Sequence, residues 1–120
     1  MRPARALAAL ALLGGIAFSA LADAPAGDAA AGKRVYLAAG CYECHGRVGQ
    51  GGAFLGPAPA LAKTELPYEA FLQQLRDPSN NMPAYAEIVL PEAQAADIYA
   101  YLQSLPPRPA ANELPAILTH

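Results

Sequence analysis

The two cysteines of this 120-residue chain lie three positions apart, and a histidine follows them at once. The segment reads Cys41-Tyr42-Glu43-Cys44-His45. C-x-x-C-H is the attachment signature of c-type haem. Two thiols on one turn can add across the two vinyl groups at one edge of the porphyrin, and the histidine then projects its imidazole toward the iron. The motif predicts one covalent haem c, held by both cysteines, with His45 as an axial ligand.

Two other interpretations of the motif compete with haem attachment. Half of a zinc site would need further Cys or His ligands at suitable spacing, and outside the motif the chain offers only His120. A thiol redox pair of the thioredoxin type requires a βαβ context, which the sequence does not predict. A disulfide within one tight turn would join no distant segments. Haem attachment is therefore the preferred interpretation.

The first 22 residues have the three parts of a cleavable secretory signal peptide. Arg2 and Arg5 precede an apolar run over 6–18, and the small residues Ala-Leu-Ala follow at 20–22. The run is shorter than the roughly 20 residues of a transmembrane helix, although a retained membrane anchor is the competing interpretation. We expect cleavage after position 22, no stable membrane insertion of the mature protein, and a periplasmic location.

The charge that remains after leader removal is acidic. Six basic side chains then face ten acidic ones, which argues against nucleic acid and anionic membranes as partners. The mature chain is short and keeps eleven of the twelve prolines, so its core is small. Chains of this size need an additional stabiliser, and a covalent haem would supply one.

Three amphipathic helices are predicted, over 28–39, 67–77 and 91–105. Loops rich in Gly or Pro connect them over 46–63 and 78–90, and no segment alternates as a strand would. Long loops in a small all-α chain are expected where they wrap a large ligand. The signals that bound the helices are Asp28 as N-cap, Gly40, Pro67, Asp77-Pro78, Pro91 and Pro106-Pro107.

Two further patterns flank the haem motif. Gly32 and Tyr36 form a G-x-x-x-aromatic pair in the first helix, and the last helix contains Asp97-Ile98-Tyr99-Ala100-Tyr101-Leu102. In this order around C-x-x-C-H, they make residues 28–105 resemble a small class I (monohaem) cytochrome c. The resemblance implies the all-α class I cytochrome c fold, with three main helices and long loops around the haem. It also implies that the first and last helices cross near these residues.

The resemblance divides the chain into a leader, a cytochrome c domain over 23–105 and a Pro-rich tail over 106–120. The tail contains four prolines and several apolar side chains. It is either a frayed terminus or an extended arm that lies on the domain or on a partner.

The sixth iron ligand is expected to be Met82. After leader removal it is the only methionine, and His120 is the only other histidine. Asn81-Met82-Pro83 lies between two helices and looks like the ligand loop of the family, whereas a gap-filling core methionine is the alternative. A thioether ligand favours ferrous iron and raises the reduction potential relative to two imidazoles.

The family resemblance also implies a partner for the ligating histidine. A metal-bound imidazole usually donates its other N–H to a fixed acceptor, which in this family is a proline carbonyl in a Gly-Pro step. Gly56-Pro57 lies at the matching distance from His45. Pro57 is therefore the expected acceptor.

With both axial positions filled by protein, the iron has no vacancy for a substrate, so we expect single-electron transfer and no enzymatic activity. The resemblance implies redox protein partners: a periplasmic dehydrogenase as donor and a downstream oxidase or cytochrome as acceptor. The protein would serve as a soluble carrier or as the cytochrome subunit of the dehydrogenase, which the apolar tail slightly favours. The competing function is a gas- or peroxide-reactive haem protein in which Met82 is a labile ligand.

Overall fold

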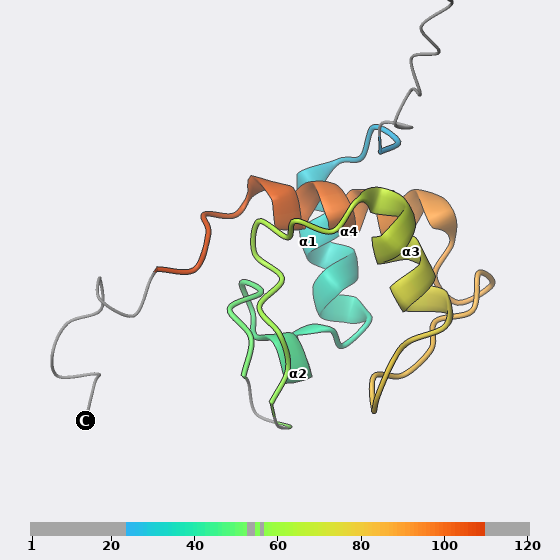
Figure 1. Cartoon of the computed structure of the whole chain (residues 1–120). Coiled ribbons are helices and arrows are strands. Elements are labelled where there is room, and N and C mark those ends of the chain that lie inside the picture. The colour runs from blue at the N-terminus through green and yellow to red at the C-terminus, as the bar shows by residue number, and fades with distance from the viewer. Residues whose placement is uncertain (1–23, 53–54, 56, 110–120) are drawn as a thin grey trace, which may run out of the picture.

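The computed structural model describes residues 24–52, 55 and 57–109, and every regular element in this part of the chain is a helix. The helices are α1 (Ala29–Ala38), α2 (Tyr42–His45), α3 (Tyr68–Arg76) and α4 (Glu92–Ser104). In Figure 1, α4 runs across the top, α1 passes beneath it, and α2 lies at the end of α1 away from α4. The predicted all-α fold is confirmed. The predicted leader, residues 110–120 of the predicted tail and His120 lie outside the described residues.

The bounds of α1 follow from local chemistry. The Asp28 carboxylate accepts a hydrogen bond from the Ala31 backbone N–H at 2.8 Å, which confirms the predicted N-cap. This contact lowers the pKa of the Asp28 carboxyl. Gly40 has a φ of +77°, a left-handed conformation that turns the chain out of the helix. The predicted helix therefore agrees with α1 to within one residue at each end.

Prolines begin the other two long helices. Pro67 and Pro91 occupy the N-cap positions, whereas the sequence predicts them as the first helical residues. Asp77 ends α3 because the following Pro78 disfavours the helical conformation of the residue before it. The sequence did not predict α2, since its four residues are too short for a periodic pattern.

Helices α1 and α4 cross where glycine allows their backbones to touch. A Cβ atom added at Gly32 would overlap the backbone carbonyl of Asp97. Beside this contact, the rings of Tyr36 and Tyr101 pack with centroids 5.5 Å apart. The Asp97 carboxylate also accepts a hydrogen bond from the backbone N–H of Asp28 at 2.7 Å. The predicted crossing near the glycine and the aromatic residues is confirmed.

Helix α3 packs against α4 through aromatic rings. Tyr99 lies 5.4 Å from Tyr68 and 5.2 Å from Phe71 between ring centroids. The core thus joins α1, α3 and α4. None of the described helices is long and apolar enough to cross a bilayer. The buried apolar residues are Tyr36, Tyr68, Phe71, Leu75, Leu90, Ala95, Ala96, Ile98, Tyr101 and Leu102.

Candidate haem-binding site

The structure brings the three predicted attachment residues together on one turn. Cys41 immediately precedes α2, and Cys44 and His45 lie within it. Both thiols are free and half-buried. The backbone N–H of Cys41 donates to the carbonyl of Tyr36 at 3.2 Å, which fixes the turn to α1. Burial raises the pKa of the Cys41 thiol. The two thiols therefore lie on one short turn, as their attachment to one edge of a porphyrin requires.

The His45 imidazole is buried, with 8% of the residue exposed. Its Nδ1 lies 2.9 Å from the carbonyl oxygen of Pro59. Because a carbonyl can only accept, Nδ1 must carry the proton, and the lone pair of Nε2 remains for a metal. A ligating histidine is usually oriented in this way by a carbonyl or a carboxylate. The ring is therefore prepared as an axial ligand.

The acceptor is Pro59, which corrects the prediction of Pro57. Backbone hydrogen bonds pair 49–52 with 58–62, among them Gly52 N–H to Ala58 O at 2.9 Å and Leu61 N–H to Gly49 O at 2.7 Å. This pairing places Pro59 beside His45 and leaves Pro57 exposed beyond the paired segment. Counting residues from the motif cannot reveal such a pairing.

Two buried tyrosines hold the chain directly after His45. The Tyr36 hydroxyl donates to the carbonyl of Gly46 at 2.7 Å, and the Tyr101 hydroxyl donates to the carbonyl of Arg47 at 3.1 Å. Burial raises the pKa of both phenols, so they remain neutral donors. The sequence predicted these tyrosines as helix packing residues, and it did not reveal that α1 and α4 also fix the backbone beside the ligand.

The predicted Met82 lies in the connection between α3 and α4, half-buried and packed against the core. Its Sδ is 3.7 Å from Nε2 of Gln74. Farther along, the Tyr85 backbone N–H donates to the carbonyl of Leu75 at 2.8 Å. One Arg76 nitrogen donates to the carbonyls of Tyr85 and Leu90, each at 2.8 Å. The last turn of α3 therefore holds the segment that carries Met82.

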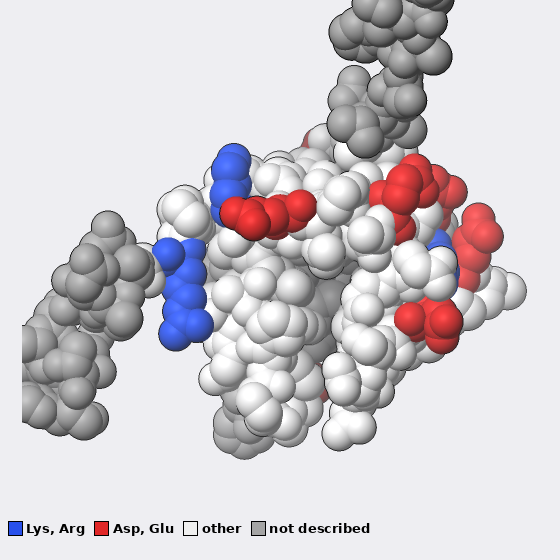
Figure 2. All heavy atoms as spheres, viewed as in Figure 1, with Lys and Arg blue, Asp and Glu red and all other residues white. Residues whose placement is uncertain are grey.

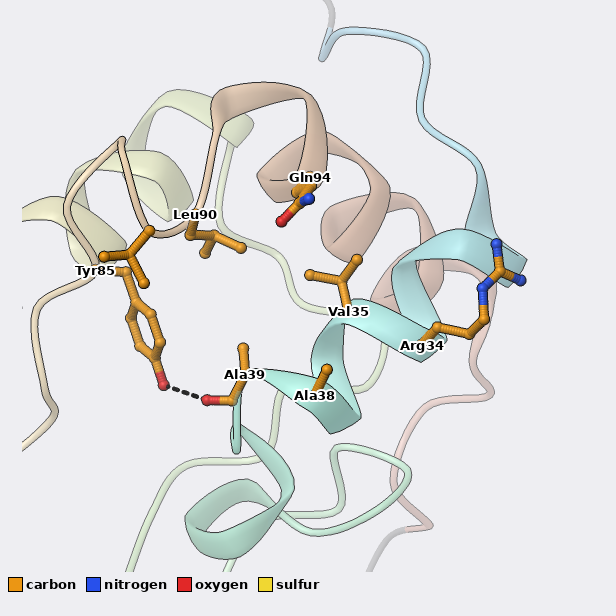
Figure 3. Close-up of a pocket in the computed structure, with 8 residues that line it drawn as sticks. Arg34, Val35, Ala38, Ala39, Tyr85, Leu90 and Gln94 are labelled. Atoms are coloured by element: carbon orange, nitrogen blue, oxygen red, sulfur yellow. Dashed lines mark hydrogen bonds between the residues drawn. The ribbon is translucent and has the colours of Figure 1, made fainter.

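Tyr85 ties the same segment to the end of α1. Its hydroxyl donates to the carbonyl of Ala39 at 2.9 Å, and Figure 3 shows the phenol reaching across to that carbonyl. Burial is the main reason that the pKa of Tyr85 is raised to about 12. The groove drawn in Figure 3 lies outside the attachment site, because none of Cys44, His45 and Met82 lines it.

The site lies on the face that Figure 2 shows as hollowed. The recess lies below α4, between the side formed by α2, 46–52 and 57–63 and the side formed by α3 and 77–90. In this view the surface on both sides of the recess consists mainly of uncharged residues, and most of the charged groups lie farther out. Two free thiols, an imidazole with a fixed tautomer and a thioether on the connection beyond α3 form a donor set that fits haem c.

Comparison with known proteins supports this assignment. Residues 27–102 match the family model described as cytochrome C oxidase, cbb3-type, subunit III. This range includes α1, α2 and α3, all of α4 except its last two residues, and every predicted ligand. No curated protein and no solved structure matches the chain. The chain therefore belongs to this family, as a small monohaem c-type cytochrome that binds one covalent haem c and serves electron transfer.

Proposed function

We propose that the protein is a periplasmic single-electron carrier whose haem is attached through Cys41 and Cys44 and ligated by His45 and Met82. One observation carries the proposal. The imidazole of His45 is buried, lies on the same turn as two free thiols, and is held in place by a hydrogen bond to the carbonyl of Pro59. When bound, the haem supplies a one-electron couple between ferrous and ferric iron.

The chain's own residues set the properties of that couple. The Pro59 carbonyl orients the His45 ring and increases its basicity as a ligand, because it accepts the Nδ1 proton at 2.9 Å. Met82 contributes a soft thioether, which favours the reduced state. With haem bound, His45 and Met82 would both hold the iron and would leave no coordination site open for a substrate. We therefore assign electron transfer and no catalysis of its own.

The surface around the recess supports brief docking with redox proteins. Apolar side chains are exposed on the described part of the chain, most strongly Ile88 at 92% and Val89 at 69%. A mainly uncharged surface beside the recess suits a small and transient interface, and Ile88 and Val89 add exposed apolar surface on the connection between α3 and α4. The proposed donor is a periplasmic dehydrogenase, and the proposed acceptor is a downstream oxidase or cytochrome. The protein would act as a soluble carrier or, with the 106–120 tail as an arm, as a complex subunit.

A second function is favoured by one observation. Met82 is only half-buried, and most of the connection that carries it is exposed. A ligand on such a segment can dissociate more readily than one anchored in the core. The second candidate is therefore a gas- or peroxide-reactive haem protein that uses a labile Met82.

Optical spectra of the wild type and of Met82→Ala test both functions. The oxidised wild type should show the weak near-infrared band of methionine bound to ferric haem, and its reduced form should not bind carbon monoxide. Met82→Ala should keep the attached haem, lose the band and bind carbon monoxide. Ile88→Ala, at an exposed position of the same connection, is the control and should behave as wild type.

The outcomes separate the candidates. An unchanged band in Met82→Ala would refute His45/Met82 ligation. A wild type that binds carbon monoxide without substitution would favour the ligand-reactive function over the electron carrier.

A further inference from the structure

A polar contact without an assigned role is made by Gln74 at the end of α3. Its side-chain amide lies 3.7 Å from the Sδ of Met82 and 3.4 Å from the Oγ of Ser79. Gln74 is half-buried on the last turn of α3, whereas its neighbour Gln73 is exposed. Nothing in the packing of α3 on α4 requires an amide at this position. The side chain is directed at the connection that carries the proposed ligand.

A thioether sulfur has two lone pairs. A metal can take one of them, and the second can accept a weak hydrogen bond. The distance from Gln74 Nε2 to Met82 Sδ lies within the range for an N–H···S contact. The same amide also has an oxygen, which lies 3.4 Å from Ser79 Oγ and can accept from that hydroxyl. Nε2 also lies 3.4 Å from the same hydroxyl, so Ser79 holds the amide at the start of the connection without selecting its orientation. The contact of Nε2 with Met82 Sδ is the one that aims the N–H group at the sulfur.

We propose that Gln74 is a positioning residue for the axial thioether: its Nε2–H donates to one lone pair of Met82 Sδ and so directs the other toward the iron. The proposal rests on the His45/Met82 ligation proposed above. A donor on the sulfur withdraws electron density from it, which weakens its donation to ferric iron more than to ferrous iron. Gln74 thus raises the reduction potential of the protein.

The placement of Gln74 supports such a role. Two neighbours of Gln74 on the same turn hold the later part of the connection. The carbonyl of Leu75 accepts from the backbone N–H of Tyr85, and the Arg76 guanidinium donates to the carbonyls of Tyr85 and Leu90. Only Gln74 contacts the side chain of Met82 through a polar group among the described residues. The neighbouring contacts fix the segment, and the Gln74 contact acts on the sulfur itself.

Gln74→Leu removes the donor at similar size and without a change of charge. Gln73→Leu makes the same chemical change one position earlier, on the exposed side of the helix. We expect the equilibrium constant for reduction to fall by up to about tenfold in Gln74→Leu, which is up to about 59 mV for a one-electron couple. The near-infrared band should also shift. Gln73→Leu should show neither change.

Gln74→Asn provides a second variant in case the leucine disturbs folding. Its amide is one methylene shorter and should not reach the sulfur, so its potential should also fall. Potentials and bands equal to those of wild type in both Gln74 variants would overturn the proposal. If the band is lost in Met82→Ala while the Gln74 variants match Gln73→Leu, only the role of Gln74 fails. If the band persists in Met82→Ala, the ligation itself fails and the role of Gln74 with it.

Discussion

The two sides of the recess are held in different ways. On the His45 side, the support comes from the core, through the buried rings of Tyr36 and Tyr101 and through paired backbone segments. On the Met82 side, half-buried side chains at the end of α3 bind a connection that is mostly exposed. Local stability falls where few buried groups support a segment. Under the proposed ligation, His45 would be the permanent anchor, and Met82 would be the ligand that the protein can adjust or lose.

The backbone shows the same contrast. After His45, glycines at 46, 49 and 51 adopt positive φ angles, and Gly49 and Gly51 leave no space for a Cβ atom beside the 58–62 segment. Such close contact permits little movement. Around Met82, by contrast, Leu90 is the only buried residue from position 77 to position 91. A change in the core should therefore affect stability, and a change at the end of α3 should affect the ligand.

Tyr36→Phe should have the largest effect on stability among the conservative changes. The substitution leaves the buried carbonyl of Gly46 without its donor, which costs about 1–3 kcal/mol in the free energy of unfolding. The near-infrared band should not change, because the methionine side is untouched. Denaturant unfolding followed by circular dichroism measures the first effect, and the oxidised spectrum checks the second.

Tyr99→Phe is the matched control. Its hydroxyl donates to the carbonyl of Leu66 at 2.7 Å in an exposed setting, where water can replace the lost bond. Its cost should be at most about 0.5–1 kcal/mol. Equal losses in the two variants would show that the core does not give the histidine side its special support.

Part of this architecture can be predicted from the sequence. Whether a feature can be predicted depends mainly on how far apart in the sequence its interacting residues lie. The C-x-x-C-H segment and the Asp28 cap depend on residues close in sequence, and the structure places them as expected. The crossing at Gly32 joins residues far apart in sequence; the family resemblance implied it, and the structure agrees. The acceptor of His45 was misassigned to Pro57, because the pairing of 49–52 with 58–62 that selects Pro59 is a tertiary contact. The contact of Gln74 with Met82 was missed for the same reason.

Arg76→Gln should mainly affect the methionine side. One guanidinium nitrogen binds the carbonyls of Tyr85 and Leu90, and the shorter neutral amide cannot keep both bonds. We expect a loss of about 1 kcal/mol, which corresponds to about fivefold more frequent opening of the connection. Cyanide should then bind the ferric protein about fivefold faster.

Arg47→Gln provides the control for the lost charge. The Arg47 guanidinium lies over the exposed side of the attachment turn, 5.2 Å from the centre of the Tyr42 ring, and it does not touch the methionine segment. Cyanide binding should stay at the wild-type rate in this variant. An equal increase in both variants would assign the effect to charge and not to the contacts of Arg76.

The effect expected at Tyr85 depends on pH. The neutral phenol donates to the carbonyl of Ala39, whereas a phenolate cannot. Burial raises its pKa from 10.0 to about 12, so the folded state favours the protonated form. When the pKa of a group is higher in the folded than in the unfolded state, the group stabilises the fold fully at any pH below its pKa in the unfolded state. This contribution is lost as the pH rises through the pKa of the folded state. The contact should therefore be intact up to about pH 10 and lost near pH 12.

Comparison of the wild type with Tyr85→Phe isolates this contact, because the other tyrosines titrate in both proteins. Below pH 10 the wild type should be more stable by about 0.5–1.5 kcal/mol, the worth of one hydrogen bond. The difference should shrink between pH 10 and pH 12, since the wild type then loses a bond that the variant never had. A difference that stays constant to pH 12 would mean that the phenol does not hold the segment through its proton. Loss of the near-infrared band over the same interval in the wild type would connect Tyr85 to the retention of Met82.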